Sequence, residues 1–290
     1  MKTIAVLTDF SERSEHAARY ALHLAQKIKA DILLFNAFLT PSDIPLVAAE
    51  VAWPLDYEEN MHETEKALGA FGKKLEHWSV QHKGHNDYAP KINCECQQGP
   101  LAIAINTIEK NKNIVLIVMG EHGADGLTTL MLGNSCRQLI DGTRIPLLLI
   151  PEHARFALPK QFAFATELNF ADVIYLSALC RFADYFSAEV VVTHVQKDSK
   201  NEQEELEAFK NRVAEKVDYK VSYRTVIGKT PRKGLEWLLT HHKPDILAMM
   251  HHDRGFFAAI FEGSQTQKMA AHTPVPILIF TYSAHHVFAF

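Results

Sequence analysis

Glycines and small polar residues follow an apolar run in the first half of this chain. The stretch VMGEHGADGLTTLMLGNSC includes Gly120, Gly123 and Gly133, and Asn134 and Ser135 follow the last of these. A glycine has no β-carbon, so the backbone can turn tightly and approach a ligand closely. The unpaired N–H groups at a helix start, together with the helix dipole, favour an anion. The residues therefore indicate either a phosphate-binding loop or glycines that only end a strand and a helix.

The common phosphate-binding motifs do not fit this stretch. The nine residues between Gly123 and Gly133 are too many for a Walker A loop, and the lysine that such a loop needs is missing. No catalytic set of serine, histidine and aspartate is recognisable from spacing, so we expect a binding protein and not an enzyme. Asp9 could orient a water next to a bound phosphate, but we favour a hydrogen bond to a ligand or a helix cap for it.

Metal binding is not expected. Cys94 and Cys96 lie two positions apart in an alternating stretch and would point to one face of a strand, but no second pair with zinc-like spacing exists. The histidine doublets point apart in a strand or helix. We interpret the four cysteines as ordinary reduced thiols of a cytoplasmic protein.

Predicted apolar strands alternate with predicted helices, and the second half of the chain repeats the order of the first. The predicted strands of the first half are 4–10, 31–38, 91–99, 113–120 and 145–151, and the predicted helices are 11–30, 57–81, 100–110 and 133–140. The second half repeats the order from a strand at 161–169 to a last helix and strand within 263–280. Strands that are apolar throughout and joined by helices predict parallel sheets covered on both faces. We therefore predict an α/β fold with two tandem doubly wound, Rossmann-like domains, at 1–152 and 158–290, each an open five-stranded parallel sheet.

Composition excludes several partners. Apolar residues make up 47% of the 290-residue chain and the formal net charge is −4. This balance argues against attraction to nucleic acid or to an anionic membrane. No apolar window is long enough for a transmembrane helix, and the first residues are interpreted as a strand and not as a signal peptide.

Polar or small residues follow three of the predicted strands. Thr8 and Asp9 follow the first, 36–38 end the second, and Met119 and Gly120 end the fourth. In open parallel sheets a ligand binds outside the carboxyl ends of the strands. These residues should therefore converge on one crevice.

The pattern G-x2-G-x9-G followed by small polar residues resembles the nucleotide motif of the universal stress protein family. The opening LTDFSERSEHA is similar to that family's first strand and helix, and the resemblance spans the chain as a tandem pair. It implies an adenine nucleotide alpha hydrolase-like fold. It also implies that Asp9 contacts the ribose or adenine side, that the backbone at Ala37 meets adenine, and that the glycine loop holds the phosphates. The implied nucleotide-binding residues are Leu7, Thr8, Asp9, Ala37, Met119, Gly120, Gly123, Gly133, Asn134 and Ser135.

The sequence departs from the family pattern in both halves. The first half has Asn134 and Cys136 where the family has serine or threonine, so we expect weakened phosphate binding. In the second half Glu167 stands at the acid position, His251 in the place of Gly120, and Arg254 in the place of Gly123. These bulky residues argue against ATP there, so we expect an empty second domain. Arg254, His251 and His252 could bind another anion, fill the crevice or form an interface. The apolar run at 256–261 could be buried between the domains or in a dimer, with a lipid or another apolar ligand as the alternative.

Three functions remain open from the sequence. The first is a stress-response regulatory module that binds ATP or a related adenine nucleotide, with or without Mg²⁺, in the first domain. The second is a nucleotide-free protein that acts by dimerisation and through an unidentified protein partner, and the third is a slow ATPase. The intact glycine spacing favours the first. Family members often dimerise through the last strand, so a tandem chain can satisfy this pairing within itself, and a homodimer of tandem chains is the alternative.

Overall fold

A computed structural model gives the architecture of the chain. It describes residues 1–38, 56–82, 84, 88–120, 134–196, 202–251 and 275–281. Within these residues no helix combines the length and the apolar character needed to cross a bilayer.

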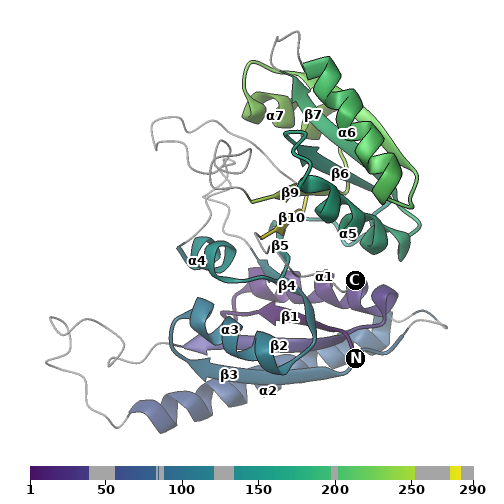
Figure 1. Cartoon of the computed structure of the whole chain (residues 1–290). Coiled ribbons are helices and arrows are strands. Elements are labelled where there is room, and N and C mark those ends of the chain that lie inside the picture. The colour runs from purple at the N-terminus through teal and green to yellow at the C-terminus, as the bar shows by residue number, and fades with distance from the viewer. Residues whose placement is uncertain are drawn as a thin grey trace, which may run out of the picture.

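Strands and helices alternate in both halves, as the sequence predicts (Figure 1). The first half contains β1 (Thr3–Leu7), α1 (Glu12–Ile28), β2 (Asp31–Phe38), α2 (Asp56–His82), β3 (Ile92–Gln98), α3 (Leu101–Asn111), β4 (Ile114–Gly120), α4 (Asn134–Gly142) and β5 (Leu147–Ile150). The second half contains β6 (Gln161–Thr166), α5 (Asp172–Asp184), β7 (Glu189–Gln196), α6 (Glu202–Lys216), β8 (Val221–Ile227), α7 (Pro231–His241), β9 (Ile246–Met250) and β10 (Ile277–Phe280). The helix predicted near residue 263 and the apolar run at 256–261 lie outside the described residues.

The strands form one sheet made of two parallel halves. The order is β3-β2-β1-β4-β5-β10-β9-β6-β7-β8. Every neighbouring pair is parallel except β5 and β10, which run antiparallel with Leu148 opposite Leu278. The predicted five-stranded parallel sheets are confirmed, and so is the expectation that the last strands pair within the chain. Because that pair is antiparallel, the strands of the two halves run in opposite directions. Their carboxyl ends therefore lie at opposite edges of the sheet.

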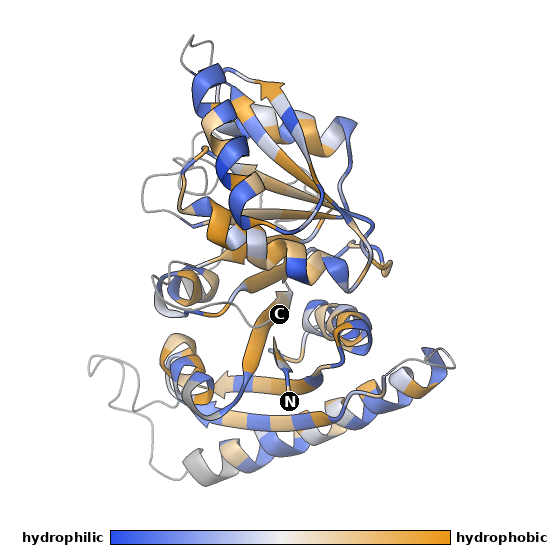
Figure 2. Cartoon of the chain, turned by 45° about the vertical axis from the view of Figure 1, so that its right-hand side comes forward, coloured by the Kyte–Doolittle hydropathy of each residue, from blue (hydrophilic) through white to orange (hydrophobic). Residues whose placement is uncertain are grey.

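Helices cover both faces of the sheet, and each face has a core that runs through both halves. One core joins α1, α2, α5 and α6 to the strands, and the other joins α3, α4 and α7 to them. Leu148 and Leu278 lie in the first core, and Leu147 and Ile277 in the second. Figure 2 shows the strands as mostly hydrophobic and the outer sides of the helices as largely hydrophilic. The two halves therefore share their buried apolar surface.

Helix α1 begins where the sequence predicts, at a serine cap. The Ser11 side chain accepts a hydrogen bond from Ser14 N, and Glu12 and Glu15 lie in the first turn, where the helix dipole favours negative charge. The helix ends at Lys29, which adopts the left-handed conformation that commonly terminates helices. These signals fix the position at which α1 leaves the carboxyl edge of the sheet.

The end of β4 packs directly on this first turn. A β-carbon added at Gly120 would lie 2.6 Å from the carbonyl oxygen of Arg13 and 3.2 Å from the amide nitrogen of Ser14. The glycine is therefore required by the contact between strand and helix backbones. The sequence analysis offered close approach to a ligand or the end of a strand as the role of Gly120, and it did not predict this contact with α1.

We predict that Gly120→Ala lowers the free energy of unfolding by about 1–3 kcal/mol, because β4 and α1 must separate to admit the methyl group. Urea denaturation of the full chain measures this. Gly69→Ala is the matched control, since an added β-carbon in the middle of α2 meets nothing within 4 Å. The control should stabilise by about 0.5–1 kcal/mol. Equal effects of the two substitutions would contradict the packing role of Gly120.

Candidate functional site

The carboxyl ends of β1, β2 and β4 meet at one edge of the first half. β1 lies between β2 and β4, and Leu7 pairs with both Phe35 and Met119. The Thr8 N–H donates to the Phe35 carbonyl at 3.0 Å, and Asn36 Nδ2 donates to the Thr8 carbonyl at 2.7 Å. The direction of strand order reverses between β1 and β4, and ligands of open α/β sheets bind at such a switch point. The predicted convergence is confirmed, and this edge is the candidate site.

The structure brings together the predicted site residues that it describes at this edge. They are Leu7, Thr8, Asp9, Ala37, Met119 and Gly120. Leu7 and Thr8 are buried, Asp9 is exposed, and the other three are half-buried. Asn134 and Ser135 are the first two residues of α4, whereas Gly123 and Gly133 lie outside the described residues.

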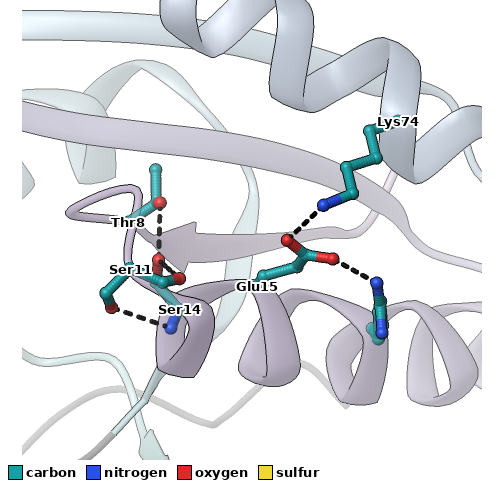
Figure 3. A network of polar contacts seen from close by, with 6 residues as sticks. Thr8, Ser11, Ser14, Glu15 and Lys74 are labelled. Atoms are coloured by element: carbon teal, nitrogen blue, oxygen red, sulfur yellow. Dashed lines mark hydrogen bonds and ion pairs between the residues drawn. The ribbon is translucent and has the colours of Figure 1, made fainter.

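A tight polar turn follows β1 and leads into α1 (Figure 3). The hydroxyls of Thr8 and Ser14 lie 2.9 Å apart, and Thr8 Oγ1 also accepts from the Phe10 N–H at 3.0 Å. Phe10 has a φ of 63°, which is uncommon for a residue with a bulky side chain. The Thr8 hydroxyl therefore holds the backbone in a turn that it would otherwise disfavour.

The Asp9 carboxylate is engaged inside the same turn. Its Oδ1 accepts from the Ser11 hydroxyl at 2.5 Å and from the Ser11 N–H at 3.1 Å. Partial burial acts to raise the pKa of Asp9, but the hydrogen bonds from Ser11 and Ser14 outweigh it and the pKa is lowered. The carboxylate is therefore held ionised and supports the cap of α1. The cap itself is made by Ser11, and Asp9, for which a cap was one predicted role, contributes only by bonding to Ser11.

Ion pairs fix α1 against α2 behind this turn. Figure 3 shows Glu15 between two cations: Lys74 Nζ from α2 lies 2.6 Å from Glu15 Oε2, and Arg19 pairs with the other carboxylate oxygen. Glu15 is one residue after Ser14, so the contact ties the first turn of α1 to its neighbouring helix. The edge that carries Thr8 and Asp9 therefore lies beside two helices that are joined by an ion pair.

Helix α4 begins on the same edge because it returns from β4 to β5. Its first two residues are Asn134 and Ser135, and the N-terminus of a helix favours an anion. Cys136 is 4% exposed and packs in the core with Leu139 and Ile105. The thiol that departs from the family pattern thus belongs to the apolar core.

The second half repeats the turn after β1 with different residues. Thr166 Oγ1 donates to Asp172 Oδ2 at 2.7 Å and accepts from the Leu168 N–H at 2.9 Å, and the φ of Leu168 is 64°. Glu167 occupies the position of Asp9 and is exposed. Threonine is followed six residues later by a polar partner in both halves, a spacing that we did not use in the sequence analysis. The signal was available, but only the structure shows that the two side chains bond.

The position of Ala37 at the end of β2 differs between the halves. Val195 of β7 corresponds to Ala37 of β2, yet it is only 3% exposed. A β-carbon added at Gly234 would lie 2.4 Å from Val195 Cγ1, and one added at Gly228 would lie 3.1 Å from that atom. These glycines allow the start of α7 and the loop before it to press against the end of β7. The second half is therefore covered where the first half leaves Ala37 half-buried.

Strand register corrects one sequence alignment. Leu7 pairs with Met119 in the first half, and Ala165 pairs with Met249 in the second, so Met250 and not His251 stands in the place of Gly120. The prediction was wrong by one residue because apolar runs without a fixed end can be aligned in more than one way. The conclusion that a bulky residue replaces this glycine remains.

His251 instead contacts the first half. Its side-chain Nε2 lies 3.9 Å from Asp141 Oδ1 near the end of α4. Its backbone N–H donates to the Phe280 carbonyl at 2.8 Å. The antiparallel β5–β10 pair directs the end of α4 to the carboxyl edge of the second half, which explains the contact. Of the alternatives from the sequence, His251 fits an interface between the halves, while His252 and Arg254 lie outside the described residues.

The cysteines are free thiols in the structure. Cys94 and Cys96 face α2, since Cys94 Sγ approaches the Leu68 carbonyl at 3.4 Å and Cys96 packs against the same core. Their predicted placement on one face of β3 is confirmed. Over the described part of the chain, no group of three histidine, cysteine, aspartate or glutamate side chains is placed to hold a metal ion.

Known proteins share both the sequence pattern and the fold. A universal stress protein from Methanocaldococcus jannaschii is 30% identical over 149 residues, which is 51% of this chain and 81% of that protein. A universal stress protein from Archaeoglobus fulgidus matches the whole fold with a TM-score of 0.69 and 16% identity, covering 96% of this chain and 98% of that chain. A Pseudomonas aeruginosa protein assigned to the same family matches with a TM-score of 0.53 and 13% identity, covering 96% and 92% of the two chains.

The family assignment follows from a match that occurs twice. The model of the universal stress protein family matches residues 1–151 and again residues 152–281. The boundary between these matches falls close to the predicted one, in the segment that joins β5 to β6. The chain belongs to the universal stress protein family and carries two of its domains in tandem.

Proposed function

We propose that the first domain binds ATP or a related adenine nucleotide, with or without Mg²⁺, and that this chain acts as a stress-response regulatory protein. Members of the universal stress protein family bind nucleotides. The observation that carries the proposal is the convergence of Thr8, Ala37 and Gly120 at the switch point of the first sheet. The start of α4 at the same edge suits the phosphates.

The second domain serves as a structural and interaction partner in this proposal. Val195 is covered by the start of α7, and Met250 stands where the first domain has glycine. Both features oppose a nucleotide placed as in the first domain. The last strands pair within the chain, so a homodimer would have to use a different surface. Such a dimer, and a protein partner, remain predictions.

We further propose binding without efficient turnover. Asp9 is the carboxylate that directly follows β1 at the candidate site, and its Oδ1 is already bonded to Ser11. Its lowered pKa makes it a weak base. A slow hydrolysis assisted by bound Mg²⁺ would therefore not depend on proton transfer to Asp9.

We predict one adenine nucleotide per chain. Denaturation of the purified protein, followed by chromatography and mass spectrometry, identifies nucleotide that co-purifies, and calorimetric titration with ATP gives the stoichiometry. After long incubation ATP should be recovered largely unchanged. Two equivalent sites would contradict the assignment of the second domain, and absence of binding at about millimolar ATP, the weak end of specific affinity, would contradict the whole proposal.

We predict that Asp9→Asn weakens ATP binding by about tenfold, because one charge-assisted hydrogen bond to the ribose is reduced. The asparagine Oδ1 can still accept from Ser11, so α1 should remain capped. Glu167→Gln makes the same change at the corresponding position of the second domain and should leave affinity unaltered. Calorimetric titration compares the two variants, with urea denaturation as the check on folding. An equal loss in both variants would contradict a site in the first domain.

A further inference from the structure

A buried histidine and a half-buried glutamate face each other at the carboxyl edge of the second domain. His194 of β7 is 9% exposed, and its Nδ1 lies 3.0 Å from the Thr166 carbonyl oxygen. Its Nε2 lies 4.0 Å from Oε2 of Glu202, the first residue of α6. Both of these facing atoms are enclosed and have no hydrogen-bond partner among the described residues. Nucleotide binding in the first domain uses neither residue.

The backbone contact determines which nitrogen of His194 carries hydrogen. A carbonyl oxygen can only accept, so the bond to Thr166 requires hydrogen on Nδ1. In a neutral imidazole Nε2 is then an acceptor, and the Glu202 carboxylate is also an acceptor. Two buried acceptors would face each other across 4.0 Å, which is costly in an enclosed site. One added proton removes this conflict.

In the first domain the corresponding carbonyl accepts its hydrogen bond from a side chain that does not titrate. Asn36 corresponds to His194, and its Nδ2 donates to the Thr8 carbonyl at 2.7 Å. The connections also differ: β2 ends at Phe38 and α2 begins at Asp56, which leaves 17 residues between them, whereas β7 ends at Gln196 and α6 begins at Glu202, which leaves five. The short connection of the second domain places Glu202, the first residue of α6, next to the end of β7. The pair therefore belongs to this half alone.

We propose that His194 and Glu202 bind one shared proton from solvent and act as a proton-dependent latch between the end of β7 and the start of α6. The proton forms an N–H bond at Nε2, and this N–H donates to the Glu202 carboxylate while no other covalent bond changes. With the proton present, the latch holds α6 against the edge of the second domain. As the pH rises the proton returns to solvent, and the two acceptors loosen the contact.

The neighbouring charges favour placing the proton on the histidine. Glu202 lies in the first turn of α6, where free N–H groups stabilise a carboxylate. The same turn carries Glu204 and Glu205, which are both exposed. On α5, Asp172 accepts from the Thr166 hydroxyl. On β8, Thr225 pairs with His194. The titratable residue Tyr223 lies two positions before Thr225, on the same face of the strand.

The experiment follows the His194 imidazole in the full chain by ¹⁵N NMR with labelled histidine, from about pH 8 to about pH 5, the range in which imidazoles titrate. His194→Asn identifies the resonance among the 16 histidines and copies the residue of the first domain. Glu202→Gln can donate an N–H to neutral Nε2, so it satisfies the site without a proton. We expect His194 to lose its second proton at a lower pH in this variant than in the wild type, because the facing carboxylate charge is removed. Glu204→Gln, an exposed change in the same helical turn, should shift the midpoint much less.

Hydrogen exchange of the second turn of α6, whose N–H groups donate to the carbonyls of the first turn, gives an independent readout. Protection should increase on acidification in the wild type beyond the intrinsic slowing of exchange, and this increase should disappear in both His194→Asn and Glu202→Gln. A wild-type His194 that is neutral at Nε2 throughout, or a midpoint unchanged by Glu202→Gln, would overturn the proposal. The wild-type titration decides the first outcome even if a variant fails to fold.

Discussion

The antiparallel pairing of β5 with β10 is the interaction on which the rest of this molecule depends. Each half contributes five parallel strands, and this one pair joins them into a continuous sheet. Strands that are apolar on both faces cannot leave an edge open to water without exposing unpaired backbone groups. Pairing the last strands covers both inner edges and extends each core through both halves. The tandem arrangement thus provides within one chain the contact that a single domain would have to find in a second copy.

The same pairing decides how the two carboxyl edges relate. Because β5 and β10 run in opposite directions, the two edges lie at opposite ends of the sheet, and α4 leads from one toward the other. Its first residues belong to the candidate nucleotide site, and Asp141 near its end contacts His251 of the second half. A helix that only connects β4 to β5 in a single domain therefore becomes part of an interface in the tandem chain.

Two copies of one turn show how a fold is kept while its surface changes. Thr8 and Thr166 each accept a hydrogen bond from the N–H of a residue in the left-handed conformation, and each bonds to a polar side chain six positions later. Around this shared geometry the halves diverge: Ala37 is half-buried, whereas Val195 is covered by α7. Backbone hydrogen bonds set the common framework, and side-chain volume decides which edge stays accessible.

Local patterns in the sequence determined much of this protein. Apolar runs, helix caps such as Ser11, and the doubled order of elements depend on near neighbours, so the fold class, the tandem repeat and the convergence at Thr8 and Gly120 could be predicted. The tertiary structure alone decided contacts between distant segments. It showed that Gly120 is needed for the backbone of α1, that Met250 stands in its place in the second half, and that His194 faces Glu202. Such contacts depend on strand register and on the path of each connection, and neither is encoded in the spacing of residues within one element.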